Sequence, residues 1–275
     1  MVAFILATIL YAQTYETVGL PKGGKLNSEE HEYSQFYLSY ANDYKNPQWV
    51  MWILDYDRMK PAVNVSRKDQ FHNDQFIKGA NTLLDFKNDS LSLSELLPTN
   101  FSSTIVHSIY QIDKGHICPA NDNNNSTTGM YDCFTMANMS PQYHIFNNGI
   151  WKKVESLTSE EIPLDIKMKY GYNSYVYVVA GPVLDKDASC YKKIGASKNV
   201  VVPEKFYKIY LIQKSDSTYD AVAWIIPQST VEEKDAEKYK VSIDEIEKET
   251  GLDFFSSLPD NIEEKIESMV NMTLY

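Results

Sequence analysis

The sequence predicts an α+β fold in which helices flank a central, mostly antiparallel sheet. The chain has 275 residues, 43% of them hydrophobic, with 20 Tyr and four Trp. This composition provides a sizeable core and favours a sheet-rich protein over a helical bundle. The predicted elements run in the order strands, loop, helix, strands, helices, which is typical of an α+β protein. No internal repeat interrupts them, and we expect residues 13–275 to form a single domain.

Four segments predict strands. Residues 49–56 (WVMWILDY) follow a turn-like stretch over 42–48, and residues 174–184 (SYVYVVAGPVL) read as a buried strand closed by Gly-Pro. Their β-branched and aromatic residues are typical of sheet cores. Residues 199–213 and 220–228 predict two more strands joined by a polar hairpin turn.

Helix signals occur at three places. The first helix is predicted over residues 140–158, with Ser140 as its N-cap and Pro141 at its first helical position. The second starts with a capping-box pattern and ends on a glycine, and the third is short; they cover residues 242–251 and 261–269.

The N-terminal residues 1–12 predict a cleaved secretory signal peptide. Val2 to Ala12 form a short apolar run, too short for a membrane span, which needs about 20 residues. A buried N-terminal strand is the alternative. We therefore expect a secreted protein, or one in the lumen of the secretory pathway, with no membrane span.

Several N-x-S/T sequons agree with secretion. The polar run 121–129 predicts an exposed loop, which makes the two asparagines inside it the better glycan acceptors. We expect Asn138, by contrast, to be buried and unmodified. The sequons start at Asn64, Asn88, Asn100, Asn124, Asn125, Asn138 and Asn271.

The chain has three cysteines, and two interpretations of them stay open. In an oxidising compartment Cys118 and Cys133 could pair and leave Cys190 unpaired; alternatively, all three are small buried hydrophobes.

The net charge of −11 is concentrated at the C-terminal end. Residues 231–275 hold thirteen acids and five lysines, a net charge of −8, which leaves −3 for the rest. Since local charge governs docking, the acidic total does not exclude a polyanionic substrate.

Candidate functional residues gather around the segment Asp113-Lys114-Gly115-His116. On the helix predicted downstream, Asn147, Trp151 and Glu155 are spaced i, i+4 and i+8 and would share one face. An amide and a carboxylate on such a face suggest a bound ion, because burying them unpaired costs free energy.

These residue types suit metal-assisted hydrolysis of a phosphodiester. Hard cations such as Mg²⁺ accept one amide oxygen and keep several waters. A histidine beside them is a candidate general base near neutral pH, and Arg67 is a candidate cation for the charge that grows on the phosphate.

The same residues resemble the DNA/RNA non-specific endonucleases, a ββα-metal family that includes endonuclease G. The resemblance covers residues 33–268. Its motifs are an Asp-Arg-Gly-His tetrad with a following Ala, an Asn-Met-x-Pro-Gln segment, and an Asn-x-Gly-x-Trp segment with a Glu. In this chain they match Asp113, Lys114, Gly115, His116 and Ala120; Asn138, Met139, Pro141 and Gln142; and Asn147, Gly149, Trp151 and Glu155.

The resemblance implies a role for each matching residue. His116 would be the general base, Asn147 the direct protein ligand of Mg²⁺ or Mn²⁺, and Glu155 the residue that holds the water around the metal. Arg67 would resemble the transition-state arginine, on a looser match through the R-x-x-x-F-x-x-D pattern.

Supporting roles follow in the same way. Asn138 and Gln142 would brace the site by hydrogen bonds, and Asp113 would hold the tetrad loop. Lys114 departs from the family, because lysine keeps the charge of arginine but not its bidentate geometry.

The resemblance further implies cleavage of DNA and RNA with little sequence preference, leaving 5′-phosphate ends. Contacts to phosphate and sugar carry no base information, which is consistent with such a lack of preference. Some members of the family are dimers, and no surface stripe in this sequence argues for or against a homodimer.

Three alternatives remain. His116, Cys118, Cys133 and His144 could form a zinc site, although their spacing is unusual. The chain could be a secreted nucleic-acid-binding protein with an impaired site, for which Lys114 and the acidic balance argue. A nuclease with a narrower preference is the third.

Overall fold

The computed structural model describes residues 15–24, 26–61, 65–67, 70–86, 111–195, 197, 199–228 and 235–270. The expected signal peptide and the sequons at Asn64, Asn88, Asn100 and Asn271 lie outside these residues. Among the helices of the described segments, none is long and apolar enough to cross a membrane.

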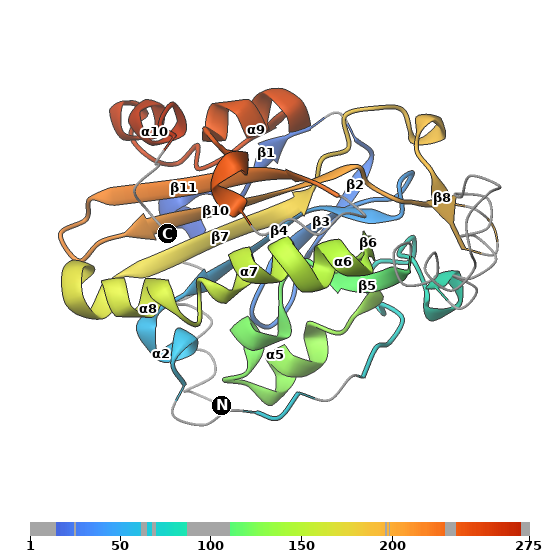
Figure 1. Cartoon of the computed structure of the whole chain (residues 1–275), viewed down its shortest axis with the longest axis horizontal. Helices are drawn as coiled ribbons and strands as arrows, with labels where there is room; N and C mark the ends of the chain where they lie inside the picture. The colour runs from blue at the N-terminus through green and yellow to red at the C-terminus, as the bar shows by residue number, and fades with distance from the viewer. Residues whose placement is uncertain are drawn as a thin grey trace.

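A seven-stranded sheet forms the centre of the described fold, and every neighbouring pair in it is antiparallel (Figure 1). This confirms the predicted sheet. The strands lie in the order β12 (Lys240–Val241), β11 (Tyr219–Pro227), β10 (Lys205–Gln213), β7 (Tyr175–Pro182), β4 (Asn46–Leu54), β3 (Tyr37–Ala41) and β2 (Ser28–Glu32).

Smaller strand pairs surround the sheet. They are β1 (Lys22–Gly23) with β13 (Leu252–Asp253), β5 (Ile112–His116) with β6 (Met139–Tyr143), and β8 (Lys193–Ile194) with β9 (Val200–Val201). The predicted strand 199–213 is thus two strands, β9 and β10. Pro203 lies between them and has no N–H to donate to a sheet ladder. The other three predicted strands correspond to β4, β7 and β11.

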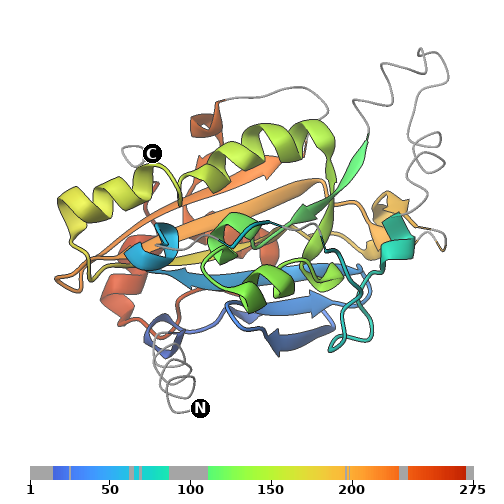
Figure 2. The same ribbon diagram turned by 90° about the horizontal axis from the view of Figure 1, so that it is seen from below.

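The sheet separates two apolar layers, because side chains alternate along each strand. On β10, Phe206 and Tyr210 enter one core cluster, whereas Ile209 and Leu211 enter the other. Figures 1 and 2 show α9 and α10 on one face of the sheet, and α5 to α8 on the opposite face. We call the face that carries α7 the front face and the face under α9 and α10 the back face.

The helices are short. Besides the helical residues 15–18, the α-helices are α2 (Tyr56–Met59), α5 (Thr127–Asp132), α6 (His144–Phe146), α7 (Lys152–Ser156), α8 (Glu161–Asp165), α9 (Ile243–Thr250) and α10 (Asp260–Glu267). The 3₁₀ turns are η1 (Leu83–Phe86), η2 (Ala120–Asn123), η3 (Met136–Asn138), η6 (Ala188–Cys190) and η7 (Ala236–Tyr239), and the π-helical turns are η4 (Asn147–Trp151) and η5 (Ile166–Tyr170).

Two of the three predicted helices are confirmed. The Ser242 side chain accepts a hydrogen bond from the Glu245 backbone N–H, and Gly251 ends α9 with a left-handed backbone (φ 72°). These are the N-cap and C-cap geometries that the sequence indicates. The third predicted helix, 261–269, corresponds to α10.

The helix predicted over 140–158 starts three residues later than expected, with Tyr143 as its N-cap and His144 as its first helical residue. Residues Met139–Tyr143 pair with β5 as strand β6, so Pro141 lies in a strand and not in a first helical turn. Ser140 does not cap a helix, because its hydroxyl donates to Asn46 Oδ1 at 2.6 Å. Pairing with β5 therefore overrides the local helix signal.

The run 121–129 is also not the exposed loop that its polarity suggests. It begins within η2 and ends in α5, and Asp122 and Asn123 are buried at 4% and 0% exposure. Of its two asparagine acceptors, Asn125 is exposed and Asn124 is partly buried.

Candidate active site

Strands β5 and β6 and the helical segment after them form a ββα unit on the front face (Figure 1). The Asp-Lys-Gly-His segment is the strand β5 itself, with Asp113 opposite Gln142 and His116 opposite Met139. The unit thus brings motifs about thirty residues apart in the chain into direct contact.

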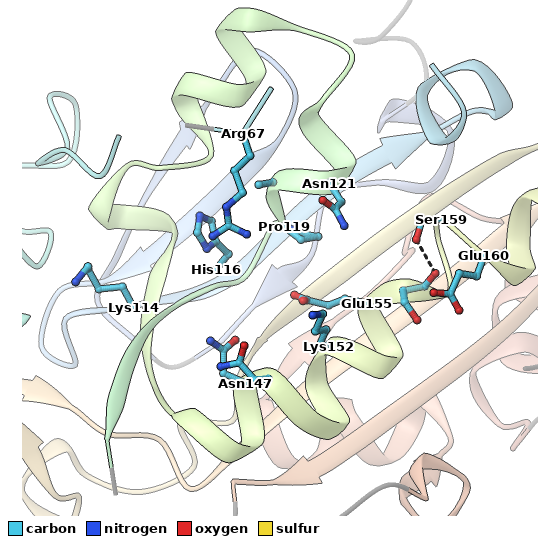
Figure 3. A pocket seen from close by; sticks show the side chains of 13 residues that line it. Arg67, Lys114, His116, Pro119, Asn121, Asn147, Lys152, Glu155, Ser159 and Glu160 are labelled. Atoms are coloured by element: carbon cyan, nitrogen blue, oxygen red, sulfur yellow. Dashed lines mark hydrogen bonds between the residues drawn. The ribbon is translucent and has the colours of Figure 1, made fainter. Parts of the chain in front are cut away.

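The unit borders a pocket that collects the main predicted site residues. Figure 3 shows His116 and Arg67 on one side and Asn147 and Glu155 on the helix opposite. The lining residues are Arg67, Lys114, His116, Pro119, Ala120, Asn121, Asn147, Asn148, Lys152, Glu155, Ser156, Ser159 and Glu160.

His116 ends β5 at the pocket wall, and its ring is held between aromatic rings. The centroid of Phe134 lies 4.7 Å away in an edge-on arrangement, and that of Phe71 lies 5.5 Å away. The Arg67 guanidinium lies 5.6 Å from the Phe134 centroid. Phe134 therefore packs against both candidate catalytic groups and limits how far each can turn.

Asp113 fixes the amide of Asn147. Asn147 Nδ2 donates to Asp113 Oδ2 at 2.9 Å, and Asn148 Nδ2 donates to the same oxygen at 3.1 Å. His144 Nδ1 lies 2.9 Å from it. Because the nitrogen of the Asn147 amide is engaged, its oxygen is the atom left to face the pocket. Asp113 thus orients a candidate ligand and does more than hold the tetrad strand.

A kink within the helical segment changes the expected helix face. Residues Asn147–Trp151 form a π-helical turn, inside which Gly149 has non-helical angles (φ −101°, ψ −111°). Trp151 is fully buried and stacks on Phe146 with 5.6 Å between the ring centroids. Asn147 and Glu155 line the pocket as predicted, but Trp151 does not share that surface.

Glu155 is a carboxylate in a poorly solvated place. Its side chain is 17% exposed, and Lys208 Nζ lies 4.0 Å from its Oε1. Burial raises the pKa of Glu155 to about 7, against the attraction of Lys208, which lowers it. The carboxylate therefore changes its charge close to neutral pH.

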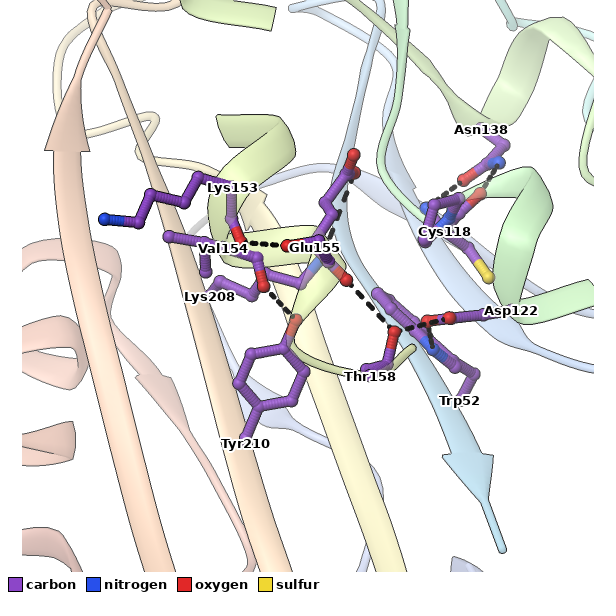
Figure 4. A network of polar contacts seen from close by, with 12 residues as sticks. Trp52, Cys118, Asp122, Asn138, Lys153, Val154, Glu155, Thr158, Lys208 and Tyr210 are labelled. Carbon is purple, nitrogen blue, oxygen red and sulfur yellow. Dashed lines mark hydrogen bonds and ion pairs between the residues drawn. The ribbon is translucent and has the colours of Figure 1, made fainter. Parts of the chain in front are cut away.

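Asn138 is fully buried, as predicted, and braces the strand end that carries His116. Its Nδ2 donates to Cys118 O at 2.9 Å and to Cys133 O at 2.8 Å, and its Oδ1 accepts from Cys118 N at 2.9 Å (Figure 4). All its polar atoms are used on the backbone, so it positions the site without lining the pocket.

Gln142 packs against Gly115 and explains the glycine of the tetrad. A Cβ at Gly115 would lie 2.0 Å from Gln142 Oε1, so any side chain there would collide. The hydrogen bonds expected from Gln142 are not found, since its buried amide has no partner among the described residues. Gln142 therefore supports the site by packing against Gly115 and not by hydrogen bonding within the part of the chain that the structure describes.

Cations gather around the pocket despite the acidic chain. Lys114 Nζ lies 5.1 Å above the ring of Phe71 and lines the rim. Together with Arg67 and Lys152 it outnumbers the two lining carboxylates, Glu155 and Glu160. The local charge therefore suits an anionic substrate.

The residues of the alternative zinc site do not converge. Among His, Cys, Asp and Glu side chains of the described segments, one group of three has ligand atoms within 4.8 Å of one another: Asp244, Glu247 and Glu267. His144 contacts Asp113 instead.

Neither interpretation of the three cysteines holds completely. Cys118 and Cys133 are buried free thiols, so the structure does not support a disulfide between them. Cys190 is also a free thiol, but it is exposed, whereas the second interpretation expected all three cysteines to be buried.

Some site residues escape sequence reasoning. Lys152 lies one turn before Glu155 and could have been found from the helix spacing. Lys208 and Asp122 lie behind Glu155. Lys208 had one signal, a charge within an otherwise buried strand, whereas Asp122 was hidden in a run that resembled a loop.

Comparison with known proteins identifies the family. The sequence pattern of the DNA/RNA non-specific endonucleases matches residues 14–261. The chain belongs to the DNA/RNA non-specific endonuclease family. The enzyme class expected from the sequence, a nuclease, is thereby confirmed.

Relatives share low but extended identity. The mitochondrial nuclease EXOG of Danio rerio is 28% identical over 87% of this chain and 64% of its own length. A nuclease of Serratia marcescens is 26% identical over 98% and 92%. Mitochondrial endonuclease G of Caenorhabditis elegans is 27% identical over 82% and 68%. The chain thus spans just under two thirds of the first relative and most of the second.

A solved structure shares the fold. Endonuclease G in its complex with EndoGI superposes with a TM-score of 0.65 at 22% identity, over 92% of this chain and 94% of that one. The agreement confirms the α+β architecture.

Proposed function

We propose that this endonuclease hydrolyses phosphodiester bonds of both DNA and RNA with the help of Mg²⁺, leaving 5′-phosphate ends. One observation carries the proposal: His116, Arg67, Asn147 and Glu155 lie far apart in the chain yet line one pocket. Mn²⁺, which also accepts oxygen ligands, is an alternative metal.

The donor set of the pocket fits a hard cation. Asp113 engages the Asn147 nitrogen and leaves the amide oxygen as the ligand atom, while Glu155 offers a carboxylate on the next turns of the helix. One amide oxygen plus waters is a workable site for Mg²⁺. When bound, the metal would polarise the phosphate and stabilise its growing charge.

The protein residues would divide the remaining work. His116 would take the proton from the attacking water, a role that suits a histidine because its ordinary pKa lies near neutral. Arg67, beside His116 in Figure 3, would donate hydrogen bonds to the phosphate oxygens as their charge grows. Glu155 would hold waters of the ion in place.

The cations around the pocket favour a substrate recognised through its backbone. Lys114 and Lys152 would contact phosphates on either side of the cleaved bond. Such contacts carry no base information, so we expect cleavage with little sequence preference.

The decisive test compares the parent protein with His116→Ala. Both would be incubated with plasmid DNA and with RNA, in Mg²⁺ and in EDTA. We expect metal-dependent cleavage of both substrates by the parent and a loss of about 10²–10⁴-fold in kcat/KM in the variant. His31→Ala is the matched control, because His31 lies on β2, stacks on Phe76 and is not among the residues that line the pocket.

The opposite result would favour the impaired, nucleic-acid-binding protein. If the parent binds both substrates but cuts neither with any divalent ion, the proposed hydrolysis fails. A reversion Lys114→Arg would then show whether the lysine is responsible.

We further propose that the protein is secreted and glycosylated. The exposed Asn125 and its neighbour Asn124 are the preferred acceptors. Expression in a glycosylating host and glycopeptide mapping should find glycan at this pair and none at the fully buried Asn138. A glycan on Asn138 in active enzyme would contradict the assigned site.

A further inference from the structure

Three cationic side chains are buried among the described residues, and one of them differs from the others. Arg58 donates to the carbonyl oxygens of Asp122, Ile53 and Gln35. Lys240 donates to Glu237 Oε2 at 2.9 Å. Lys208, which is fully buried, has no hydrogen-bond partner in the described part of the chain. A structural role accounts for the first two, but it leaves the third unexplained.

Lys208 is held by aromatic rings and by charge. It lies on the front face of β10, with its Nζ 4.9 Å from the ring centroid of Trp52 and 5.1 Å from that of Trp151. Such rings attract a cation through their faces. The opposite charge nearest to it is Glu155 Oε1 at 4.0 Å. Glu155 therefore lies between the buried ammonium and the pocket.

A rigid polar frame surrounds this pair (Figure 4). Asp122 accepts hydrogen bonds from Trp52 Nε1 at 2.8 Å and from the Thr158 hydroxyl at 2.7 Å. The Tyr210 hydroxyl donates to Val154 O at 2.9 Å and ties α7 to the sheet. Glu155 thus cannot easily move away from Lys208.

We propose that Lys208 is a positioning residue of the endonuclease, whose charge beneath Glu155 keeps that carboxylate anionic and directed at the water shell of the metal. The inference rests on the proposed role of Glu155. A buried ammonium without hydrogen bonds is costly, and here the rings and Glu155 offset that cost. Its charge is useful because the carboxylate itself is poorly solvated.

The electrostatics agree with this geometry. Burial lowers the pKa of Lys208, and Glu155 and Asp122 oppose that shift. Lys208 in turn lowers the pKa of Glu155, which burial raises to about 7. Besides each other, Lys208 and Glu155 are acted on by Asp122, Cys118 and Arg67. The other charged or titratable groups that line the pocket beside Glu155 are His116, Lys114, Lys152 and Glu160.

The experiment is Lys208→Met in the full chain, with kcat/KM measured from pH 5.5 to 9.5 at saturating Mg²⁺. Loss of an opposite charge at this distance should move the acidic limb of the profile up by about one to three pH units. A shift of one pH unit lowers the activity at pH 7 about fivefold and a larger shift lowers it more, and the activity recovers at high pH. The melting temperature should fall more at pH 9.5 than at pH 5.5, because only a charged Glu155 is left without its partner.

Lys240→Met is the matched control, since Lys240 is equally buried but is paired at the edge of the sheet. It should leave the pH profile unchanged. Lys208→Gln provides the same neutralisation if the methionine variant does not fold. The proposal would be overturned if folded Lys208→Met had the same pH profile of kcat/KM as the parent, or if it lost the same fraction of activity at every pH.

The Glu155→Gln background separates this inference from the proposed function. If Lys208 acts through Glu155, adding Lys208→Met to Glu155→Gln has no further effect on kcat/KM. If Glu155→Gln is as active as the parent, the role of Glu155 itself fails. If Glu155→Gln is impaired while Lys208→Met keeps the parental profile, only the inference about Lys208 fails.

Discussion

The two faces of the central sheet differ in what they bury. The back face packs aliphatic side chains such as Ile209 and Leu211 against α9 and α10. The front face, at the same depth, buries Asp122, Asn138 and Lys208. Lys208 differs from Ile209 and Leu211 by side-chain alternation along β10, whereas Asp122 and Asn138 come from η2 and η3, which cover the front face only.

The contrast indicates where stability and function reside. A buried polar group costs free energy unless it is paired. Asp122 and Asn138 are hydrogen-bonded, so of these three groups Lys208, which has no hydrogen-bond partner among the described residues, is the one that gives up stability. The front face is also the one that bears the pocket. We infer that the back face mainly stabilises the fold, while the front face orients His116, Asn147 and Glu155.

The largest expected effect on the front face is that of Asn147→Ala. Removal of the candidate metal ligand should lower kcat/KM by a factor on the order of 10³ at fixed Mg²⁺, since a bound metal contributes several kcal/mol to the transition state. Excess metal should restore part of the activity. Kinetics across a Mg²⁺ titration measure this.

Asn261→Ala, on α10 at the back face, is the control and should match the parent. An unchanged metal requirement in Asn147→Ala would remove the distinction between the faces, because the amide that Asp113 orients would then have no function.

On the back face, Leu211→Ala should reduce stability but not catalysis. The side chain is fully buried under α9 and α10, and such truncations cost about 2–5 kcal/mol. Denaturant unfolding measures the loss, and kcat at a temperature where the protein is folded should stay at the parental value. A fall in kcat of more than a few-fold would mean that the faces are coupled.

The smallest effect concerns pH and Glu155. Its pKa of about 7 in the folded protein lies above the ordinary value, so activity should decline about tenfold per pH unit below 7. Stability depends on pH in the opposite direction to activity. The folded state binds the proton of Glu155 more tightly than the unfolded state does, so protonated Glu155 stabilises the fold at acidic pH. This stabilisation is lost as the pH rises through 7.

Without metal, the parent should therefore lose stability relative to Glu155→Gln between pH 5 and pH 8. Parallel unfolding curves of the two proteins at both pH values test this. Equal changes in the two would show that Glu155 titrates like an exposed carboxylate.

The four longest strands and the two C-terminal helices were predictable, because their signals are local. Apolar runs rich in β-branched and aromatic residues mark β4, β7, β10 and β11, and caps mark α9. The helix start at His144 was not predictable in the same way. Ser140 and Pro141 form a sound local helix signal, but hydrogen bonding to β5 places them in a strand. The exposed loop predicted over 121–129 was wrong for the same reason. Asp122 is buried by contacts with Trp52 and Thr158, which are far away in the sequence.

By itself, the sequence determined the type of sheet, the order of the motifs and the main residues of the pocket (His116, Asn147 and Glu155), because residue composition and motif spacing are properties of the chain itself. The tertiary structure decided which atoms do what. In the folded protein, the Asn147 side-chain nitrogen donates a hydrogen bond to Asp113, and the helical segment is kinked at Gly149. Lys208, fifty-three residues from Glu155 in the chain, lies 4.0 Å from it. Electrostatic influence depends on distance and burial, and neither can be read along the chain.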